Sequence, residues 1–327
     1  AALDVRRKHY ENRLLSNPYE YDTWLDLAKL EENASITSNE TKFVRLVYSN
    51  AIKNIPPTNI KENWKRYIYL WIFWVIYEEM TAKDKEKTRE VYNSCLKIIP
   101  HKQFTFGKIW VMAAEFEIRS QNLTNARKIL GTACGKCAHL RKSSIYRKYI
   151  ALESSLGEID RCRNIYGKWL EVMPENSAAW IGLASMEQKV GEIERYRAVY
   201  ELSLQQDLMN DRDSLWQAYI QSERNEGNII QVRNLYERLL NQMGHVRVWI
   251  AYGVFEGGLD YDNDNNNNNE LQQHCDIIVM RQVFQRAYTA LKDQGLKDER
   301  VLLLNAWREC ELKIPSGDGD VTIVEAK

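Results

Sequence analysis

The sequence predicts an all-α protein built as a solenoid of helix-turn-helix repeats, and two recurring residue patterns carry this prediction. In the first pattern a large apolar residue stands seven places before a glutamate, and the pattern returns at intervals of 33 to 55 residues. Residues seven apart share one face of a helix, so each copy marks an amphipathic helix. The copies are Trp24/Glu31, Trp71/Glu78, Trp110/Glu117, Tyr146/Glu153, Trp180/Glu187, Trp216/Glu223, Trp249/Glu256 and Leu304/Glu311.

The second pattern places an arginine three residues before another large apolar residue, one short segment after the glutamate. From glutamate to arginine the distance is ten residues in four consecutive repeats. This regularity indicates two helices joined by a turn of constant length. The copies are Arg45/Tyr48, Arg89/Tyr92, Arg127/Leu130, Arg163/Tyr166, Arg197/Tyr200, Arg233/Tyr236 and Arg281/Phe284.

The composition agrees with a long helical array. Glycine (15) and proline (6) are scarce, while tryptophan (10) and tyrosine (18) are abundant, which suits helices packed through aromatic rings. The 327 residues exceed the usual size of one compact domain, about 250 to 300, whereas a solenoid has no such limit. With 45 basic and 45 acidic residues the chain has no long-range field toward nucleic acid or an anionic membrane. Its six scattered cysteines indicate a reducing compartment.

Each repeat is predicted to begin with a helix A and to continue with a helix B. In helix A the side chains of Trp180, Leu183, Ala184 and Glu187 form one stripe. A short turn that often carries glycine follows, and then a second amphipathic stretch such as residues 232–240, which is helix B.

The repeat length matches that of tetratricopeptide-like hairpins. Between Trp110 and Trp249 the intervals are 36, 34, 36 and 33 residues. Pro18 and Pro174 each stand six residues before a repeat tryptophan, where they are expected to end helix B. The longest apolar run, residues 67–77, is too short for a membrane span of about 20 residues.

We expect residues 1–315 to form a single array of about seven to eight helical hairpins. The array starts inside a repeat, because Arg7 and Tyr10 have the helix B pattern with no helix A before them. Residues 258–272 are rich in asparagine and are expected to be a disordered insertion, and residues 316–327 a flexible tail. On this view the chain is part of a longer superhelix.

A glutamate on the packing stripe of helix A is costly unless a cation meets it. We hypothesise that the arginine ten residues later supplies that cation, so that Glu187 and Arg197 clamp one hairpin while the tryptophan fills the space between helices. A solvated surface charge is the alternative. The residues of this structural repeat signature are Trp24, Glu31, Trp71, Glu78, Trp110, Glu117, Arg127, Glu153, Arg163, Trp180, Glu187, Arg197, Trp216, Glu223, Arg233, Trp249 and Glu256.

No residue constellation predicts catalysis, a cofactor or a metal site, and the chain is not expected to be an enzyme. Carboxylates spread along a solenoid do not converge on one substrate. Cys134, Cys137 and His139 have part of a zinc-ligand spacing, but no fourth ligand follows, so they are predicted to be structural. Nucleotide-binding, metalloprotease and serine-hydrolase motifs are absent from the sequence, and no small-molecule substrate is predicted.

One stretch holds more aromatic residues than a hairpin needs. Between residues 64 and 77 aromatic side chains occur on every face of the predicted helix, which indicates burial on all sides or a partner surface. The candidates for a partner surface are Trp64, Tyr69, Phe73 and Trp74. A basic cluster is predicted to be a solvated helix face, with contact to phosphate as the alternative. It comprises Lys136, Arg141, Lys142, Arg147 and Lys148.

The repeat pattern resembles the half-a-tetratricopeptide (HAT) repeat. It consists of a tryptophan, an aromatic or small residue four places later, a glutamate seven places later and then an Arg-x-x-Tyr segment. Particular segments are similar to the crooked neck family of splicing factors, from about residue 5 to about residue 312, and to the C-terminal half of that family. These segments are 88–110, 116–119, 159–163, 236–240 and 245–249. Tyr146 and Leu304 depart from the pattern because they replace its tryptophan.

The resemblance implies a right-handed superhelical solenoid of HAT repeats and a non-catalytic scaffold of the spliceosome in the nucleus. The implied partners are proteins of the nineteen complex, including Myb-type and other HAT-repeat subunits, and no cofactor is implied. Two alternatives stay open at this point. One is a module that contacts RNA, with weak contacts to small nuclear RNA or pre-mRNA, and the other is a HAT scaffold of mRNA 3′-end processing.

Overall fold

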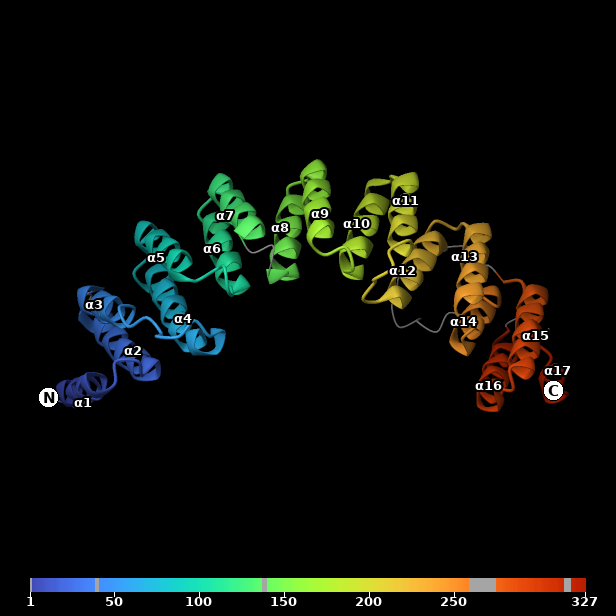
Figure 1. The fold of residues 1–327 in the computed structure, drawn as a ribbon, viewed down its shortest axis with the longest axis horizontal. Coiled ribbons are helices and arrows are strands. Elements are labelled where there is room, and N and C mark those ends of the chain that lie inside the picture. Colours follow the sequence, from blue (N-terminus) through green and yellow to red (C-terminus); the bar gives the residue numbers. More distant parts are fainter. Residues whose placement is uncertain (1, 39–40, 137–139, 259–274, 315–318) are drawn as a thin grey trace. The chain divides into compact units, whose positions relative to one another are not determined.

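The computed structural model describes residues 2–38, 41–136, 140–258, 275–314 and 319–327, and this part of the chain is almost wholly helical, with no strand (Figure 1). The all-α prediction is therefore confirmed. No helix in these ranges has both the length and the apolar character that crossing a membrane requires. Contacts divide the chain into two compact units, Ala1–Met173 and Pro174–Lys327. The prediction of one array over residues 1–315 stays a prediction.

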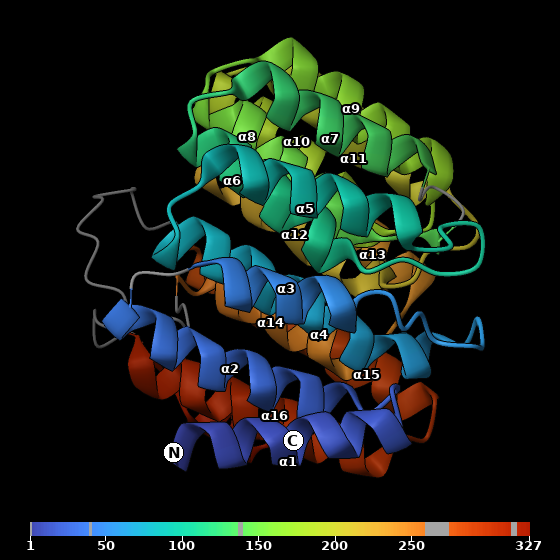
Figure 2. The same cartoon turned by 90° about the vertical axis from the view of Figure 1, so that its left-hand side faces the viewer.

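The first unit contains a single helix followed by four hairpins, of which the even-numbered helices are helices A and the odd-numbered ones helices B. Figure 2 shows these helices lying roughly parallel in chain order. They are α1 (Ala2–Ser16), α2 (Tyr21–Ser38), α3 (Thr41–Ala51), α4 (Lys61–Ile76) with the π-helix η1 (Tyr77–Thr81), α5 (Lys85–Ile98), α6 (Gly107–Arg119), α7 (Leu123–Lys136), α8 (Ser143–Ser155) and α9 (Ile159–Val172).

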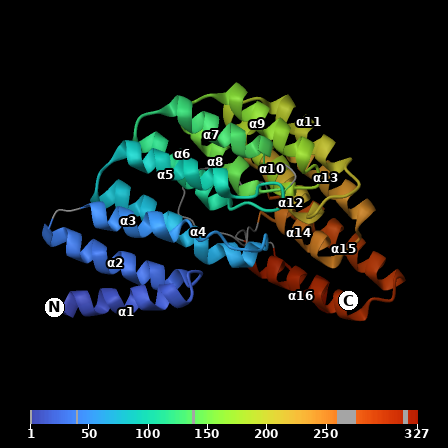
Figure 3. The same cartoon turned by 60° about the vertical axis from the view of Figure 1, so that its left-hand side comes forward.

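The second unit contains three hairpins, a further helix A and one short helix, in the same order (Figure 3). They are α10 (Ser177–Val190), α11 (Ile193–Leu204), α12 (Arg212–Asn225), α13 (Ile229–Gln242), α14 (Val246–Glu256), α15 (Ile277–Asp293), α16 (Lys297–Lys313) and α17 (Thr322–Glu325). Each helix B packs on its own helix A and on the helix A that follows it in the same unit.

The turn between helices A and B explains the constant ten-residue spacing. Four residues after the repeat glutamate one residue takes the left-handed conformation, for example Gly227 with φ 71° after Glu223. The next residue, Asn228, donates its backbone N–H to the carbonyl of Glu223 at 3.0 Å and caps helix B by accepting from the N–H of Gln231. Glycine suits this position because it has no Cβ penalty at positive φ.

The hairpin of α4 and α5 is one residue longer, with eleven residues from Glu78 to Arg89. The π-helix Tyr77–Thr81 accommodates the extra residue, since its wider turn takes one more residue than an α-helical turn. The rest of the turn is as in the other repeats: Lys83 has φ 54°, and the N–H of Asp84 donates to the carbonyl of Glu78 at 3.0 Å.

Two tryptophans are anchored by the turn before their helix. The indole Nε1–H of Trp24 donates to the carbonyl of Pro18 at 2.9 Å, and that of Trp180 donates to the carbonyl of Pro174 at 2.8 Å. Helices α1 and α9 end two residues before these prolines, as the sequence predicts. The spacing of six residues thus places an acceptor carbonyl under each indole.

Aromatic rings of consecutive repeats stack face to face. The ring three residues after the arginine of helix B lies on the ring four residues before the next glutamate. Such stacks contribute roughly 0.5–1.5 kcal/mol beyond burial. They are Tyr48 on Trp74 (centroids 5.8 Å apart), Tyr200 on Tyr219 (4.7 Å), Tyr236 on Tyr252 (4.9 Å) and Phe284 on Trp307 (5.4 Å).

The last repeat differs from its predicted pattern. Leu304, the residue assigned to the tryptophan position, is only half-buried, whereas Trp307 is buried one turn later and donates from Nε1 to Glu311 at 3.1 Å. The helix presents Trp307 to Phe284, so the larger ring fills the interface between α15 and α16.

The described part of the predicted flexible tail, residues 319–327, contacts the last repeat, and its flexibility stays a prediction. The backbone N–H of Asp320 donates to the carboxylate of Glu311 at 3.0 Å, and Val324 of α17 is buried. The sequence shows no apolar periodicity here because a four-residue helix is too short to display one. The predicted disordered insertion, residues 258–272, lies outside the described residues apart from Gly258.

Candidate functional site

The repeat arginines and glutamates form bidentate ion pairs between neighbouring repeats. In each described pair the Nε and Nη2 atoms of an arginine on helix B donate to the two carboxylate oxygens of the glutamate on the next helix A, at 2.5–3.0 Å. The pairs within the two units are Arg7–Glu31, Arg45–Glu78, Arg89–Glu117, Arg127–Glu153, Arg197–Glu223, Arg233–Glu256 and Arg281–Glu311.

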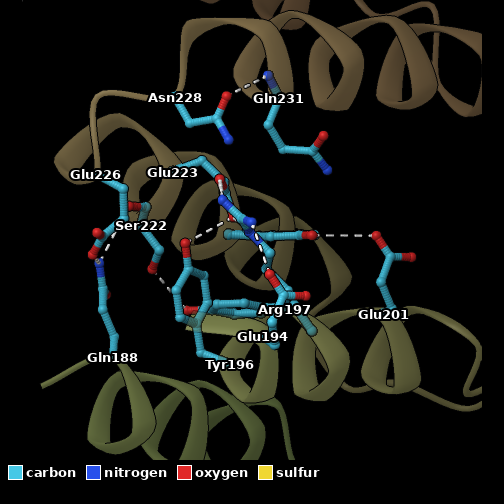
Figure 4. Close-up of polar contacts among 12 residues, drawn as sticks. Gln188, Glu194, Tyr196, Arg197, Glu201, Ser222, Glu223, Glu226, Asn228 and Gln231 are labelled. Carbon is cyan, nitrogen blue, oxygen red and sulfur yellow. Dashed lines mark hydrogen bonds and ion pairs between the residues drawn. The ribbon is translucent and has the colours of Figure 1, made fainter. Parts of the chain in front are cut away.

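The pair of Arg197 and Glu223 corrects the predicted clamp within one hairpin. Arg197 does not pair with Glu187 of its own hairpin as hypothesised but reaches from α11 to α12, with N–O distances of 2.7 and 2.8 Å (Figure 4). The hydroxyl of Tyr196 donates to the same carboxylate at 2.8 Å. The clamp therefore fixes the register between repeats.

The direction of the arginine follows from the face of helix B on which it lies. Arg197 stands three residues before Tyr200, and residues three apart share a helix face. Tyr200 stacks on Tyr219 of α12, so this face of α11 meets the next repeat. Sequence spacing alone does not show which glutamate Arg197 meets. Glu187 of its own hairpin lies ten residues before it, and Glu223 of the next repeat lies 26 residues after it.

Burial makes these pairs costly to break. All charged side chains that are buried in the described part of the chain are repeat glutamates, namely Glu31, Glu78, Glu117, Glu153, Glu187, Glu223, Glu256 and Glu311. The carboxylate hydrogen bonds raise the pKa of Arg197. Burial raises the pKa of Glu311, but hydrogen bonds from Arg281, the Asp320 N–H and Trp307 outweigh it and leave this pKa below its ordinary value.

The predicted aromatic partner surface is only partly exposed. Trp64 and Trp74 are buried in the core of the first unit, and their indole N–H groups donate to the carbonyl of Thr58 and to Glu78. These two residues are therefore excluded as surface contacts, because α4 packs against helices on several sides. Tyr69 and Phe73 are exposed by 45% and 36%, and they remain a proposal.

The exposed aromatic residues belong to a longer apolar stripe. Ile76 and Met80 continue the face of Tyr69 and Phe73 at helical spacing and are also exposed. The ammonium group of Lys29 lies 5.5 Å from the ring centroid of Phe73. The sequence pattern did not separate this outward stripe from the buried ring positions, since aromatic residues occupy both.

The interpretations of the cysteine and basic clusters stay predictions. Cys137 and His139 lie outside the described residues, and no group of three or more metal-ligating side chains occurs inside them. Lys148 of the basic cluster forms an ion pair with Glu115 at 2.6 Å. The carboxylate of Glu115 thereby balances the positive charge of Lys148 within the protein.

A second set of ion pairs, which the repeat patterns did not predict, joins consecutive helices B. Glu201 of α11 accepts from Arg238 of α13 at 2.7 and 2.9 Å, and Glu237 accepts from Arg286 of α15 at the same distances. These hydrogen bonds lower the pKa of Glu201 and Glu237. In the sequence these pairs are marked by a glutamate four residues after one repeat arginine and by an arginine five residues after the repeat arginine of the next helix B.

Comparison with known proteins agrees with this architecture. Residues 7–240 match the family described as pre-mRNA-splicing factor Syf1/CRNKL1 C-terminal HAT repeat. The chain is 46% identical over 318 residues to pre-mRNA-splicing factor clf1 of Aspergillus fumigatus, covering 94% of this chain and 45% of that protein. It is 41% identical over 310 residues to pre-mRNA-splicing factor cwf4 of Schizosaccharomyces pombe, covering 94% and 45%.

A human relative shows a similar match. The chain is 42% identical over 309 residues to crooked neck-like protein 1 of Homo sapiens, covering 94% of this chain and 34% of that protein. The chain thus spans less than half the length of these relatives. With the repeat geometry and these matches together, the chain belongs to the crooked neck-like family of HAT-repeat pre-mRNA-splicing factors.

Proposed function

We propose that this chain is a non-catalytic scaffold of the spliceosome that binds other splicing proteins in the nucleus. One observation supports the proposal most directly. Every buried charged side chain of the described residues is a repeat glutamate, and in each described pair its carboxylate is occupied by an arginine of the neighbouring repeat. Such carboxylates maintain the stacking of repeats, and the outer faces of the helices are left for partners.

The partners follow from the family. The relatives are named as pre-mRNA-splicing factors, and we extend that role to this chain. We further propose association with the nineteen complex, through its Myb-type and other HAT-repeat subunits. The balanced charge of the sequence favours recognition by shape and local patches over a general attraction to RNA.

Recovery from nuclear extract tests this proposal. The tagged chain is incubated with extract, recovered with and without ribonuclease treatment, and its companions are identified by mass spectrometry. Splicing proteins of the nineteen complex that persist after ribonuclease treatment are expected. If ribonuclease treatment removes all companion proteins, the chain would instead act by contacting RNA. Recovery of 3′-end cleavage factors would place the chain in the 3′-end processing machinery.

A further inference from the structure

Helices B of consecutive repeats are bridged in the second unit by ion pairs at fixed repeat positions. The carboxylate comes from the fourth residue after the repeat arginine and the cation from the fifth residue after the next repeat arginine. Glu201 with Arg238 and Glu237 with Arg286 both follow this rule, each with two hydrogen bonds. The two seams that they close are α11–α13 and α13–α15.

The seam between α7 and α9 has the cation of this bridge but lacks the carboxylate. The carboxylate position is Gly131, four residues after Arg127, and the cation position is Lys168, five residues after Arg163. Lys168 is exposed and makes no ion pair with any residue that the structure describes.

The other seams of the first unit have no such unmatched cation. At the corresponding cation positions α3 has Asn50, α5 has Ser94 and α7 has Thr132. Among the seams within the two units, Lys168 is therefore the one cation at this position without its carboxylate in the described structure.

A groove of about 500 Å³ lies along this incomplete seam. Helix α8 lies between α7 and α9 (Figure 1). Its Tyr146 and Tyr149 contribute to the lining of the groove. Gly131 and Gly135 line it from α7, and a Cβ added to either glycine would meet no atom within 4 Å. The absence of two side chains on one helix face leaves room for the backbone of another chain to approach closely.

The charge at the groove is predominantly positive. Arg161 and Lys168 line it from α9, and Lys128 stands one turn before Gly131 on the exposed side of α7. The acidic residue in the lining is Glu171. Arg161 reaches Glu158 only at 3.6 Å, between exposed side chains, which leaves its charge largely available.

We infer that this groove binds an acidic segment of another protein, whose carboxylate pairs with Lys168 in the place that Glu201 and Glu237 occupy in the closed seams. A small or apolar neighbour of that carboxylate enters the groove above Tyr146 and Tyr149, and the segment's backbone passes over Gly131. The template is internal to the chain: the same helix positions already hold a carboxylate against a cation twice. This inference rests on the proposed scaffold function, since it names the chemistry of one partner.

Peptide selection on the purified chain tests the inference. A display library of random 15-residue peptides is selected on residues 1–327, with counter-selection against the Gly131→Glu variant, which restores the carboxylate within the chain. We expect enriched peptides to share an aspartate or glutamate beside small or apolar residues. The affinity of these peptides for the chain should fall at least about tenfold when the acidic residue is replaced by its amide. The Lys168→Glu variant should bind the unaltered peptides more weakly by the same factor.

The matched control is Asn93→Glu, which adds the same charge at the same repeat position of α5, where the next helix B offers Thr132 instead of a cation. This variant should bind the selected peptides like the unaltered chain. Gly131→Glu should melt no lower than the unaltered chain, since glycine is unfavourable inside a helix, so its loss of binding does not reflect unfolding.

Three results would overturn the inference: no enriched peptide, enriched peptides without an acidic residue, or binding that Gly131→Glu leaves unchanged. A 15-nucleotide single-stranded RNA that binds the chain and is lost with Gly131→Glu would reassign the groove to nucleic acid. Each result is independent of the recovery experiment in nuclear extract. If splicing proteins are recovered but no peptide binds here, the scaffold function stands and the groove inference fails.

Discussion

Removing the carboxylate of Glu223 should destabilise the second unit by about 3 kcal/mol. The side chain is fully buried and accepts from Arg197 Nε and Nη2 at 2.7 and 2.8 Å and from the Tyr196 hydroxyl at 2.8 Å. Breaking a buried pair costs roughly 3–5 kcal/mol. The Arg197 side chain is 26% exposed, so water can solvate its charge once the carboxylate is removed. This solvation offsets part of the cost, and we expect the lower end of the range.

Urea unfolding of Glu223→Ala measures this loss, which corresponds to about 6–12 °C in Tm for a unit of this size. Arrays of repeats can lose cooperativity, so hydrogen exchange of α11 and α12 accompanies the unfolding curve. Amides of both helices should exchange faster, since the clamp joins the two repeats. Faster exchange confined to α12 would contradict an inter-repeat role.

A double-mutant cycle of Glu223→Ala and Arg197→Ala isolates the pair itself. The coupling energy should be about 2 kcal/mol or more. Glu194→Ala is the control, because this carboxylate lies 3.5 Å from the same guanidinium but is 92% exposed, and its removal should cost less than about 0.5 kcal/mol. A coupling energy below about 0.5 kcal/mol between residues 197 and 223 would refute the clamp.

Three further predictions follow from local geometry. Gln121 has φ 62° in a turn where other repeats have glycine, so Gln121→Gly should raise the free energy of unfolding by about 1 kcal/mol in urea titrations, whereas Gln121→Ala should not. The pKa of Glu311 is lowered in the folded state, so its stabilising pairing with Arg281 is present at neutral pH and is lost as pH falls below the ordinary value of 4.5. Glu311→Gln should therefore be less stable at pH 7 and show a smaller loss of stability on acidification; an unchanged slope would contradict this. The thiol of exposed Cys275 should react with a disulfide reagent more than about a hundredfold faster than that of buried Cys95, whose pKa burial raises, and equal rates would show that the first unit opens readily.

The repeat architecture could be predicted from the sequence because its signals are local. Helix periodicity and the left-handed residue at Gly191 or Gly227 act within one hairpin, and the prolines before Trp24 and Trp180 act within six residues of the indole that they anchor. A local signal depends on the backbone of a few neighbouring residues, so linear spacing is enough to reveal it. The helix order and the position of the turns followed from these signals.

The partners of the side chains could not be predicted in the same way. The spacing of Glu187 and Arg197 fitted a clamp within the hairpin, yet the structure turns Arg197 to Glu223 because its helix face meets the next repeat. Aromatic residues on α4 likewise divided into buried Trp74 and exposed Phe73, two positions that differ by one residue but by about 100° around the helix.

The sequence by itself determined the class of fold, the two helices of each repeat and the residues of its signature, since these depend on period and turn chemistry. Only the tertiary structure decided which repeat each arginine clamps and which seam between helices B lacks its carboxylate. Such choices depend on the rotation of each helix about its axis, which packing against two neighbours sets jointly. The missing carboxylate at Gly131 becomes apparent only once Glu201 and Arg238 are seen to close the equivalent seam.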